Sequence, residues 1–168
     1  MNRHILSVLV ENQSGVLSRI SGLFSRRGYN IDSLAVGETE DSTVSRMTIV
    51  VQGDDYILEQ IKKQLNKLID VIKIISLAPN VSVFRELVLV KVSATEKNRA
   101  SITEIVSIFR ASIIDVSNST LTVELTGDQE KIQAFLELMR PYGIKELVRT
   151  GLSALQRGDT QISQTVTE

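Results

Sequence analysis

The sequence predicts an α+β protein made of two successive β-α-β-β-α-β units. Short apolar segments rich in valine and isoleucine, typical of strands, alternate with longer segments whose apolar residues recur every three to four positions, typical of amphipathic helices. This order occurs twice within the 168 residues, and a Gly-Asp step falls at the same point of each copy, at 53–54 and 127–128. Each unit is therefore expected to have a ferredoxin-like fold, in which two helices cover one face of a four-stranded antiparallel sheet.

The first unit opens with a strand and a helix. The segment HILSVLV at 4–10 is short, apolar and rich in β-branched residues, as a buried strand requires. The helix that follows is expected to end at Gly28, after two arginines that suit the negative end of a helix dipole. Its apolar stripe is predicted to consist of Leu17, Ile20 and Phe24, with Val16 and Leu23 beside them.

The remaining elements of the first unit follow in the order that the fold requires. Strands are predicted at 31–36 and 44–51, joined by the polar hairpin GETEDST. A second helix starts near Asp54, and the strand VIKIISL at 71–77 closes the unit. The second helix has an apolar stripe at helical spacing, formed by Ile57, Ile61, Leu65 and Leu68. Residues 1–77 are therefore expected to form the first domain.

The second unit repeats this order after a linker. Residues 78–84 contain the first of two prolines and are expected to be the linker. A C-terminal ferredoxin-like domain is expected at 85–156, followed by a polar tail at 157–168 that lacks periodicity. Its elements are predicted as strand 85–94, helix 100–110, strands 112–116 and 120–125, helix 128–140 and strand 144–151.

Composition limits the functions that this chain can have. The formal net charge is −1, and the expected central strands carry no aromatic residue, so neither a basic surface nor a base-stacking surface for nucleic acid is expected. No apolar run approaches the roughly 18 residues that span a bilayer, and the N-terminus lacks the features of a secretory signal. We therefore expect a cytoplasmic protein, or one in an equivalent organelle compartment, with no membrane partner.

Groups that could perform catalysis are scarce. The chain has no cysteine, and its one histidine, His4, lies at the start of the first strand, which excludes cysteine- and histidine-based nucleophilic sites. No pair of carboxylates is spaced as a general acid and base would be, and no phosphate-binding glycine loop is present. Catalysis by this chain alone is therefore not expected.

The turn between the first strand and the first helix is the strongest candidate for a binding site. A helix N-terminus offers free backbone N–H groups and a partial positive charge, which suit a carboxylate. Gly15 has no Cβ, so a ligand could approach the backbone there, and the Asn12 amide could either accept or donate a hydrogen bond. Taken alone, these residues fit a plain capping turn as well, and both interpretations stay open at this point.

The longest informative stretch is ENQSGVLSRISGLFSRRGYNIDSL, from Glu11 to Leu34. Together with SRMTIVV, GDDYILEQIKKQLNKLIDVIKI and the later ELVLVKV and IIDV, it resembles the small regulatory subunits of acetohydroxyacid synthase, also called acetolactate synthase. The resemblance covers essentially the whole chain. A hydrophobic strand followed by N-x-x-G-V-L also resembles the more general pattern of ACT domains, which bind amino acids.

This resemblance implies a regulatory function. In such proteins the first unit is an ACT domain that pairs with a second copy to form a homodimer, and the end-product amino acid, usually valine, binds where the copies meet. The catalytic large subunit supplies thiamine diphosphate, magnesium and FAD, and no cofactor or metal is expected on this chain. The implied site consists of Asn12, Gln13, Ser14, Gly15, Val16 and Leu17 of one copy with Asn30 and Ile31 of the other.

Two other interpretations stay open at the level of sequence. The chain could be a free-standing amino-acid sensor of the same fold that acts on another partner. It could also be a purely structural assembly module, in which the turn at 12–15 is only a helix cap. A small unit of about 75 residues buries only about 60% of its unfolded surface, so self-association is expected in every case.

Overall fold

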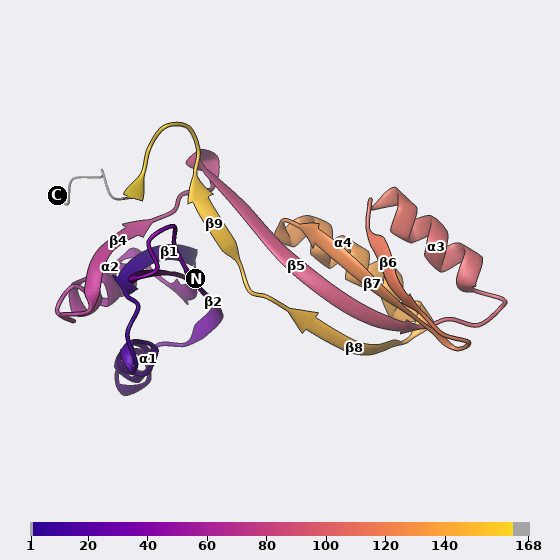
Figure 1. The fold of residues 1–168 in the computed structure, drawn as a ribbon, viewed down its shortest axis with the longest axis horizontal. Coiled ribbons are helices and arrows are strands. Elements are labelled where there is room, and N and C mark those ends of the chain that lie inside the picture. Colours follow the sequence, from indigo (N-terminus) through magenta and orange to yellow (C-terminus); the bar gives the residue numbers. More distant parts are fainter. Residues whose placement is uncertain (1, 163–168) are drawn as a thin grey trace. The chain divides into compact units, whose positions relative to one another are not determined.

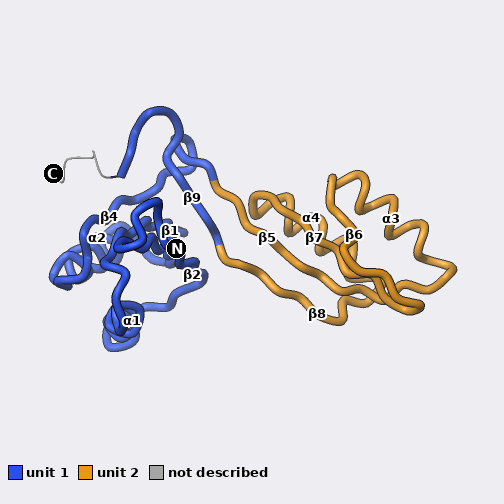
Figure 2. The backbone as a smooth tube through the Cα atoms, in the orientation of Figure 1, with its two compact units in different colours: residues 1–83, 152–168 blue, residues 84–151 orange. Residues whose placement is uncertain are grey.

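The computed structural model describes residues 2–162. Within that range the chain divides into two compact units (Figure 2). The first contains residues 2–83 together with 152–162, and the second contains residues 84–151.

The first unit contains a four-stranded antiparallel sheet with the strand order β2-β3-β1-β4 (Figure 1). Strands β1 and β3 lie in its centre, and β2 and β4 form its edges. The elements in chain order are β1 (Asn2–Glu11), α1 (Val16–Arg27), β2 (Ile31–Glu38), β3 (Val44–Gly53), α2 (Asp55–Leu65) and β4 (Val71–Ser76).

Helix α1 forms because its apolar residues recur at helical spacing and face the sheet. The structure differs from the predicted stripe at its first position. Val16 is 3% exposed and belongs to the core, whereas Leu17 is 46% exposed. Val16 and Ile20 are separated by a full turn, so both point into the core, and Leu17 is turned away from it. The helix ends at Gly28, whose left-handed φ of 70° lets its N–H reach carbonyls of the last turn.

The two faces of this sheet differ in what covers them. Alternate residues of β1, such as Leu6 and Val8, pack against the helices. The register places Ser7 opposite Thr48 and Leu9 opposite Arg46, and these side chains lie on the other face because successive residues of a strand alternate. We call this second face the open face because the two helices pack on the other one, although Ser7, Thr48 and Leu9 on it are buried.

The second unit repeats the arrangement with the strand order β6-β7-β5-β8. A further strand, β9 (Ser153–Gln156), also pairs with β5. Short 3-10 turns occur at Pro79–Val81 and Arg140–Tyr142. The main elements are β5 (Ser82–Ser93), α3 (Arg99–Ile108), β6 (Ser112–Val116), β7 (Thr120–Gly127), α4 (Gln129–Met139) and β8 (Ile144–Arg149). The predicted α+β class with two β-α-β-β-α-β units is confirmed.

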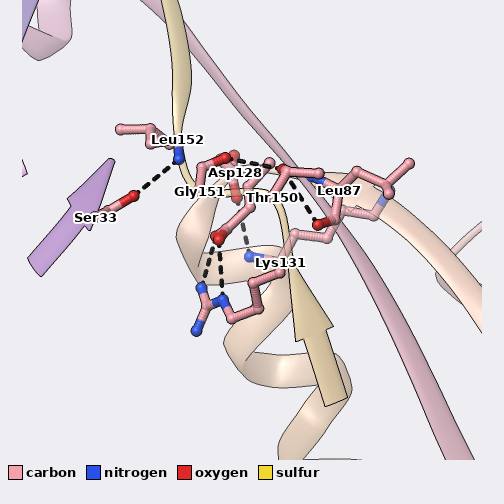
Figure 3. Close-up of polar contacts among 9 residues, drawn as sticks. Ser33, Leu87, Asp128, Lys131, Thr150, Gly151 and Leu152 are labelled. Atoms are coloured by element: carbon pink, nitrogen blue, oxygen red, sulfur yellow. Dashed lines mark hydrogen bonds and ion pairs between the residues drawn. The ribbon is translucent and has the colours of Figure 1, made fainter. Parts of the chain in front are cut away.

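The boundaries between units differ from those expected. Residues 152–156 were expected in the second domain, and in the structure they group with the first compact unit. Leu152 and Ala154 are 4% and 5% exposed, and the Leu152 N–H donates to the Ser33 hydroxyl of β2 at 3.0 Å (Figure 3). The hydrogen bond to Ser33 attaches the start of this segment to β2. In the second unit, Thr150 pairs instead with Leu87, accepting from its N–H through the hydroxyl at 3.1 Å (Figure 3).

The expected tail also takes part in the fold as far as the structure describes it. The Arg157 N–H donates to the Val81 carbonyl at 2.8 Å and its Nε donates to the Ser82 carbonyl at 3.1 Å. Ile162 is 7% exposed. The expected linker at 78–84 contains the first 3-10 turn and the start of β5. Residues 163–168 of the expected tail lie outside the described residues.

Candidate functional site

The turn between β1 and α1 is held in place by backbone hydrogen bonds from two other parts of the unit. The Glu11 N–H donates to the Asp70 carbonyl at 2.9 Å, and the Asn12 N–H donates to the Thr43 carbonyl at 2.7 Å. Gln13 N–H donates back to the Glu11 carbonyl at 3.0 Å. The start of helix α1 is therefore positioned by the sheet and not by local sequence alone.

Gly15 is the N-cap of α1 and adopts a left-handed conformation with φ 85° and ψ −9°. No side chain of residues 2–162 caps this helix start. The Val16 N–H reaches the Gln13 carbonyl only at 3.4 Å. The N–H groups of Leu17 and Ser18 lie in the first turn, where a helix has no carbonyl of its own to offer them. These donors and the positive end of the helix dipole can bind an anion.

Arg19 adds a positive charge one turn further along the helix. Its Nε and Nη2 donate to the two carboxylate oxygens of Asp70 at 2.6 and 3.0 Å, a bidentate pair. The hydrogen bond to Asp70 raises the pKa of Arg19, so the guanidinium stays charged. A Cβ added to Gly15 would lie 3.0 Å from Arg19 Nη1. The Arg19 guanidinium therefore lies beside the space that Gly15 leaves, and the approach of a ligand to the backbone at Gly15 stays a prediction.

Hydrogen bonds fix the orientation of the Asn12 side-chain amide. Its Nδ2 donates to Glu38 Oε1 at 3.0 Å and to the Ser42 carbonyl at 2.8 Å. Both partners are acceptors, so the amide nitrogen must face them and Oδ1 must face the opposite way. Of the two functions expected for this amide, accepting a hydrogen bond from a ligand ammonium fits the structure. Donating to a carboxylate does not fit, because both Nδ2 hydrogens are used.

The other predicted residues lie around this turn or after the helix. Gln13 and Ser14 are exposed in the turn, Val16 is buried in the core, and Leu17 is exposed beside the helix start. Val16 can therefore contribute its backbone but not its side chain. Asn30 follows the glycine exit of α1 and donates through Nδ2 to Asp32 Oδ1 at 2.8 Å.

Ile31 begins the edge strand β2 and pairs with Val51 of β3. Strand β2 has one neighbour in the sheet, so its other edge is free to meet a second chain. That Asn30 and Ile31 approach the turn of a second copy stays a prediction.

The corresponding turn of the second unit carries hydrogen bonds made by the side chains of Asn98 and Arg99. Between β5 and α3, the Thr95 N–H donates to Asn98 Oδ1 at 2.7 Å. Arg99 Nη2, at the first helical position, donates to the carbonyls of Ser117 and Asn118 at 2.8 and 3.0 Å. The N-cap there is Asn98 with a right-handed φ of −113°. Helix α3 also has no side-chain cap hydrogen bond, so the two helix starts differ in the left-handed glycine of the first unit and in the bonds that Arg99 makes to Ser117 and Asn118 in the second.

Comparison with known proteins shows the family of this chain. Residues 6–73 match the family model described as the AHAS small subunit-like ACT domain, and residues 85–158 match the model for the small subunit of acetolactate synthase. The chain belongs to the family of acetolactate synthase small subunits. The resemblance inferred from the sequence, including the ACT domain, is confirmed.

Relatives of this small subunit match along almost their whole length. The probable acetolactate synthase small subunit of Methanothermobacter thermautotrophicus is 58% identical over 156 residues, covering 92% of this chain and 93% of the relative. The acetolactate synthase small subunit of Mycolicibacterium smegmatis is 56% identical over 155 residues, covering 92% and 91%. The crystal structure of the small subunit from Thermotoga maritima superposes with a TM-score of 0.89 at 40% identity, covering 95% of this chain and all of that one.

The structure adds residues that sequence reasoning missed. Arg19, Asp70 and Glu38 surround the predicted turn, and only Arg19 had a signal in the sequence, because it lies four residues after Gly15 on the same helix face. Within residues 2–162, no cluster of three or more acidic or histidine side chains is arranged to hold a metal ion. Over the same range, no helix has both the length and the apolar character needed to cross a membrane.

Proposed function

We propose that this chain is the non-catalytic regulatory subunit of acetolactate synthase, binding valine or another branched-chain amino acid where the first units of two copies meet. The observation that carries the proposal is the uncapped start of α1 at Gly15, with the Arg19 guanidinium held beside it. Family membership supports a complex with a catalytic subunit, to which the thiamine diphosphate, magnesium and FAD of the reaction would belong.

The polar groups of the turn suit the two charges of an amino acid. The ligand carboxylate accepts from the N–H groups of Leu17 and Ser18, near the guanidinium of Arg19. The ligand ammonium donates to Asn12 Oδ1, and the neighbouring Glu38 carboxylate favours a positive charge at that end. Positive and negative protein groups thus flank opposite ends of the zwitterion, which gives the ligand one orientation.

The aliphatic side chain of the ligand needs an apolar wall. Leu17 is 46% exposed beside the helix start and supplies one side. Asn30 and Ile31 of the partner subunit close the other side in this proposal, so the ligand contacts both copies. Its binding then changes how the two copies are held, and a coupling of about 1–3 kcal/mol to the catalytic subunit is enough for feedback inhibition.

The catalytic subunit performs the chemistry in this proposal. The one histidine of this chain already has partners within the fold, since His4 Nε2 lies 3.2 Å from the Gly53 carbonyl and 4.0 Å from an Asp55 carboxylate oxygen. The contribution of the small subunit is activation of the catalytic subunit and sensitivity to the end product. Selectivity for valine over leucine or isoleucine is a matter of one methylene, worth about 1–3 kcal/mol.

Reconstitution with an acetolactate synthase catalytic subunit tests this proposal. Acetolactate formation is measured for the catalytic subunit alone, for the mixture, and for the mixture with valine. We expect the small subunit to raise the rate and valine to lower it again. Valine binding by calorimetry without any effect on acetolactate formation would identify a sensor for another enzyme, and absence of valine binding would identify a structural module.

A further inference from the structure

Arg46 lies on the open face of the first sheet. It belongs to the central strand β3, opposite Leu9 of β1 and Gly37 of β2. Its Nη1 donates to the hydroxyl of Ser7 at 3.2 Å, and Ser7 is fully buried. No carboxylate of residues 2–162 forms an ion pair with it.

This environment is costly for a guanidinium. Arg46 is partly buried on a sheet face that it shares with Ser7, Thr48 and Leu9, and one bond to a neutral hydroxyl uses one of its five N–H donors. Buried charges in proteins are usually paired with an opposite charge, because the loss of hydration is otherwise uncompensated. An anion placed against the remaining donors would provide that pairing.

Space for such an anion exists next to Arg46. A cavity of about 480 Å³ lies between the open face and the C-terminal segment 156–162, and a second of about 270 Å³ lies between β2, β3 and β9. Arg46 and Leu155 line both cavities. The larger volume lies within the roughly 300–1,000 Å³ that is usual for small-molecule sites.

The walls of the larger cavity indicate the chemistry of its ligand. Leu9, Ile75, Leu155 and Ile162 supply an aliphatic surface. Besides Arg46, the charged residues of the lining are Glu40 and Asp41. Hydrogen bonds from the Thr43 hydroxyl and N–H lower the pKa of Asp41, so this carboxylate stays ionised. With Glu40 and Asp41 the lining carries one net negative charge, which disfavours phosphates and other multiply charged anions. A single carboxylate is favoured only directly against the Arg46 guanidinium.

We propose that this open-face cavity is a second ligand site of the small subunit, which binds a short aliphatic monocarboxylate. The carboxylate accepts from the guanidinium of Arg46, and the hydrocarbon part packs against Leu9, Ile75 and Leu155. The hairpin at 38–43 links this cavity to the turn at the start of α1, because Asn12 binds Glu38 and Ser42 while residues 39–41 line the cavity. A ligand in the cavity therefore acts on the hairpin that also orients Asn12.

Isobutyrate is a suitable probe, because it has a carboxylate and a branched aliphatic chain but lacks the ammonium group that the proposed site at α1 binds. Full-length protein with labelled Ile, Leu and Val methyl groups is titrated with isobutyrate and followed by NMR. We expect saturable shifts at Leu9, Ile75, Leu155 and Ile162, with a Kd in the millimolar range, roughly 1–10 mM. Absence of saturation up to about 50 mM would overturn the proposal.

Matched variants identify the group that binds the carboxylate. Arg46→Gln removes the charge and should weaken isobutyrate binding by about tenfold or more. Ser7→Ala removes the neutral hydrogen bond to Arg46 but keeps the guanidinium, so its affinity should stay within about threefold of the original. Equal binding by Arg46→Gln, or tighter binding of inorganic phosphate than of isobutyrate, would contradict the assignment.

A further variant covers the case in which Arg46→Gln does not fold. Leu155 is 57% exposed, so Leu155→Ala should leave the fold intact. It removes part of the aliphatic wall and should weaken isobutyrate binding while phosphate binding is unaffected. Unchanged isobutyrate affinity in Leu155→Ala would overturn the proposed site. Because isobutyrate carries no ammonium, failure of these tests does not bear on valine binding at α1.

Discussion

Substitution of Gly15 separates backbone strain from exclusion of the ligand carboxylate. With φ at 85°, any L-residue at this position occupies the left-handed region. For Gly15→Ala this costs about 1–2 kcal/mol. The new Cβ would also meet Arg19 Nη1 at 3.0 Å, but this is the end of a flexible side chain and can move. For a chain of this size, each kcal/mol lowers the melting temperature by about 2–4 °C, so a decrease of roughly 2–8 °C is expected.

Gly15→Asp should show the opposite balance between stability and binding. Aspartate tolerates the left-handed region better than alanine does. Its carboxylate can cap the N–H groups of the first turn, which contributes about 0.5–2 kcal/mol, and it can accept from Arg19 Nη1. The Asp variant should therefore be at least as stable as the Ala variant. It should nevertheless lose valine binding by about a hundredfold or more, because its own carboxylate occupies the position of the ligand carboxylate.

Thermal unfolding by circular dichroism and valine titration calorimetry on the three proteins test this reasoning. From most to least stable, the expected order is the original protein, Gly15→Asp and Gly15→Ala. From highest to lowest valine affinity, it is the original protein, Gly15→Ala and Gly15→Asp. Valine affinity of Gly15→Asp equal to that of the original protein would remove the helix start from the site. Equal loss of binding in both variants would show that backbone geometry, and not an occupied anion position, controls binding.

Three further predictions concern other parts of the molecule. Asn30→Ala should weaken valine inhibition of the reconstituted enzyme while leaving activation largely intact, and loss of activation as well would show a structural role for Asn30. Hydrogen bonds from Thr43 lower the pKa of Asp41 in the folded protein. The stability that the Asp41 carboxylate adds to the hairpin is therefore present above its unfolded-state pKa and is lost as the pH falls through its folded-state pKa. The NMR shift of the Thr43 amide should accordingly titrate below the ordinary aspartate range. Phe135→Ala removes a fully buried ring from the second core and should destabilise that unit by about 3–5 kcal/mol, with valine affinity in the first unit unchanged by calorimetry.

Local sequence patterns predicted most of the secondary structure correctly because apolar periodicity depends on neighbouring residues. The predicted helix stripe was wrong at Leu17 alone, since Val16 and Leu17 are both apolar and only packing against the sheet shows which one is buried. The C-terminal segment was expected to be a polar tail because Arg157 and its neighbours are polar. In the folded chain, the buried Ile162 and the hydrogen bonds from the N–H and Nε of Arg157 attach it to the first unit.

The sequence alone determined the element order, the family and the position of the turn at 12–15 that we propose as the binding site, because these depend on short-range patterns and on motifs that are contiguous in the chain. The tertiary structure decided which groups surround that turn. Glu38 lies 26 residues from Asn12, Asp70 lies 51 residues from Arg19, and Leu152 lies 119 residues from Ser33. Such pairs form only when the sheet brings distant segments together, so no local pattern reveals that Asn12 keeps only its acceptor free.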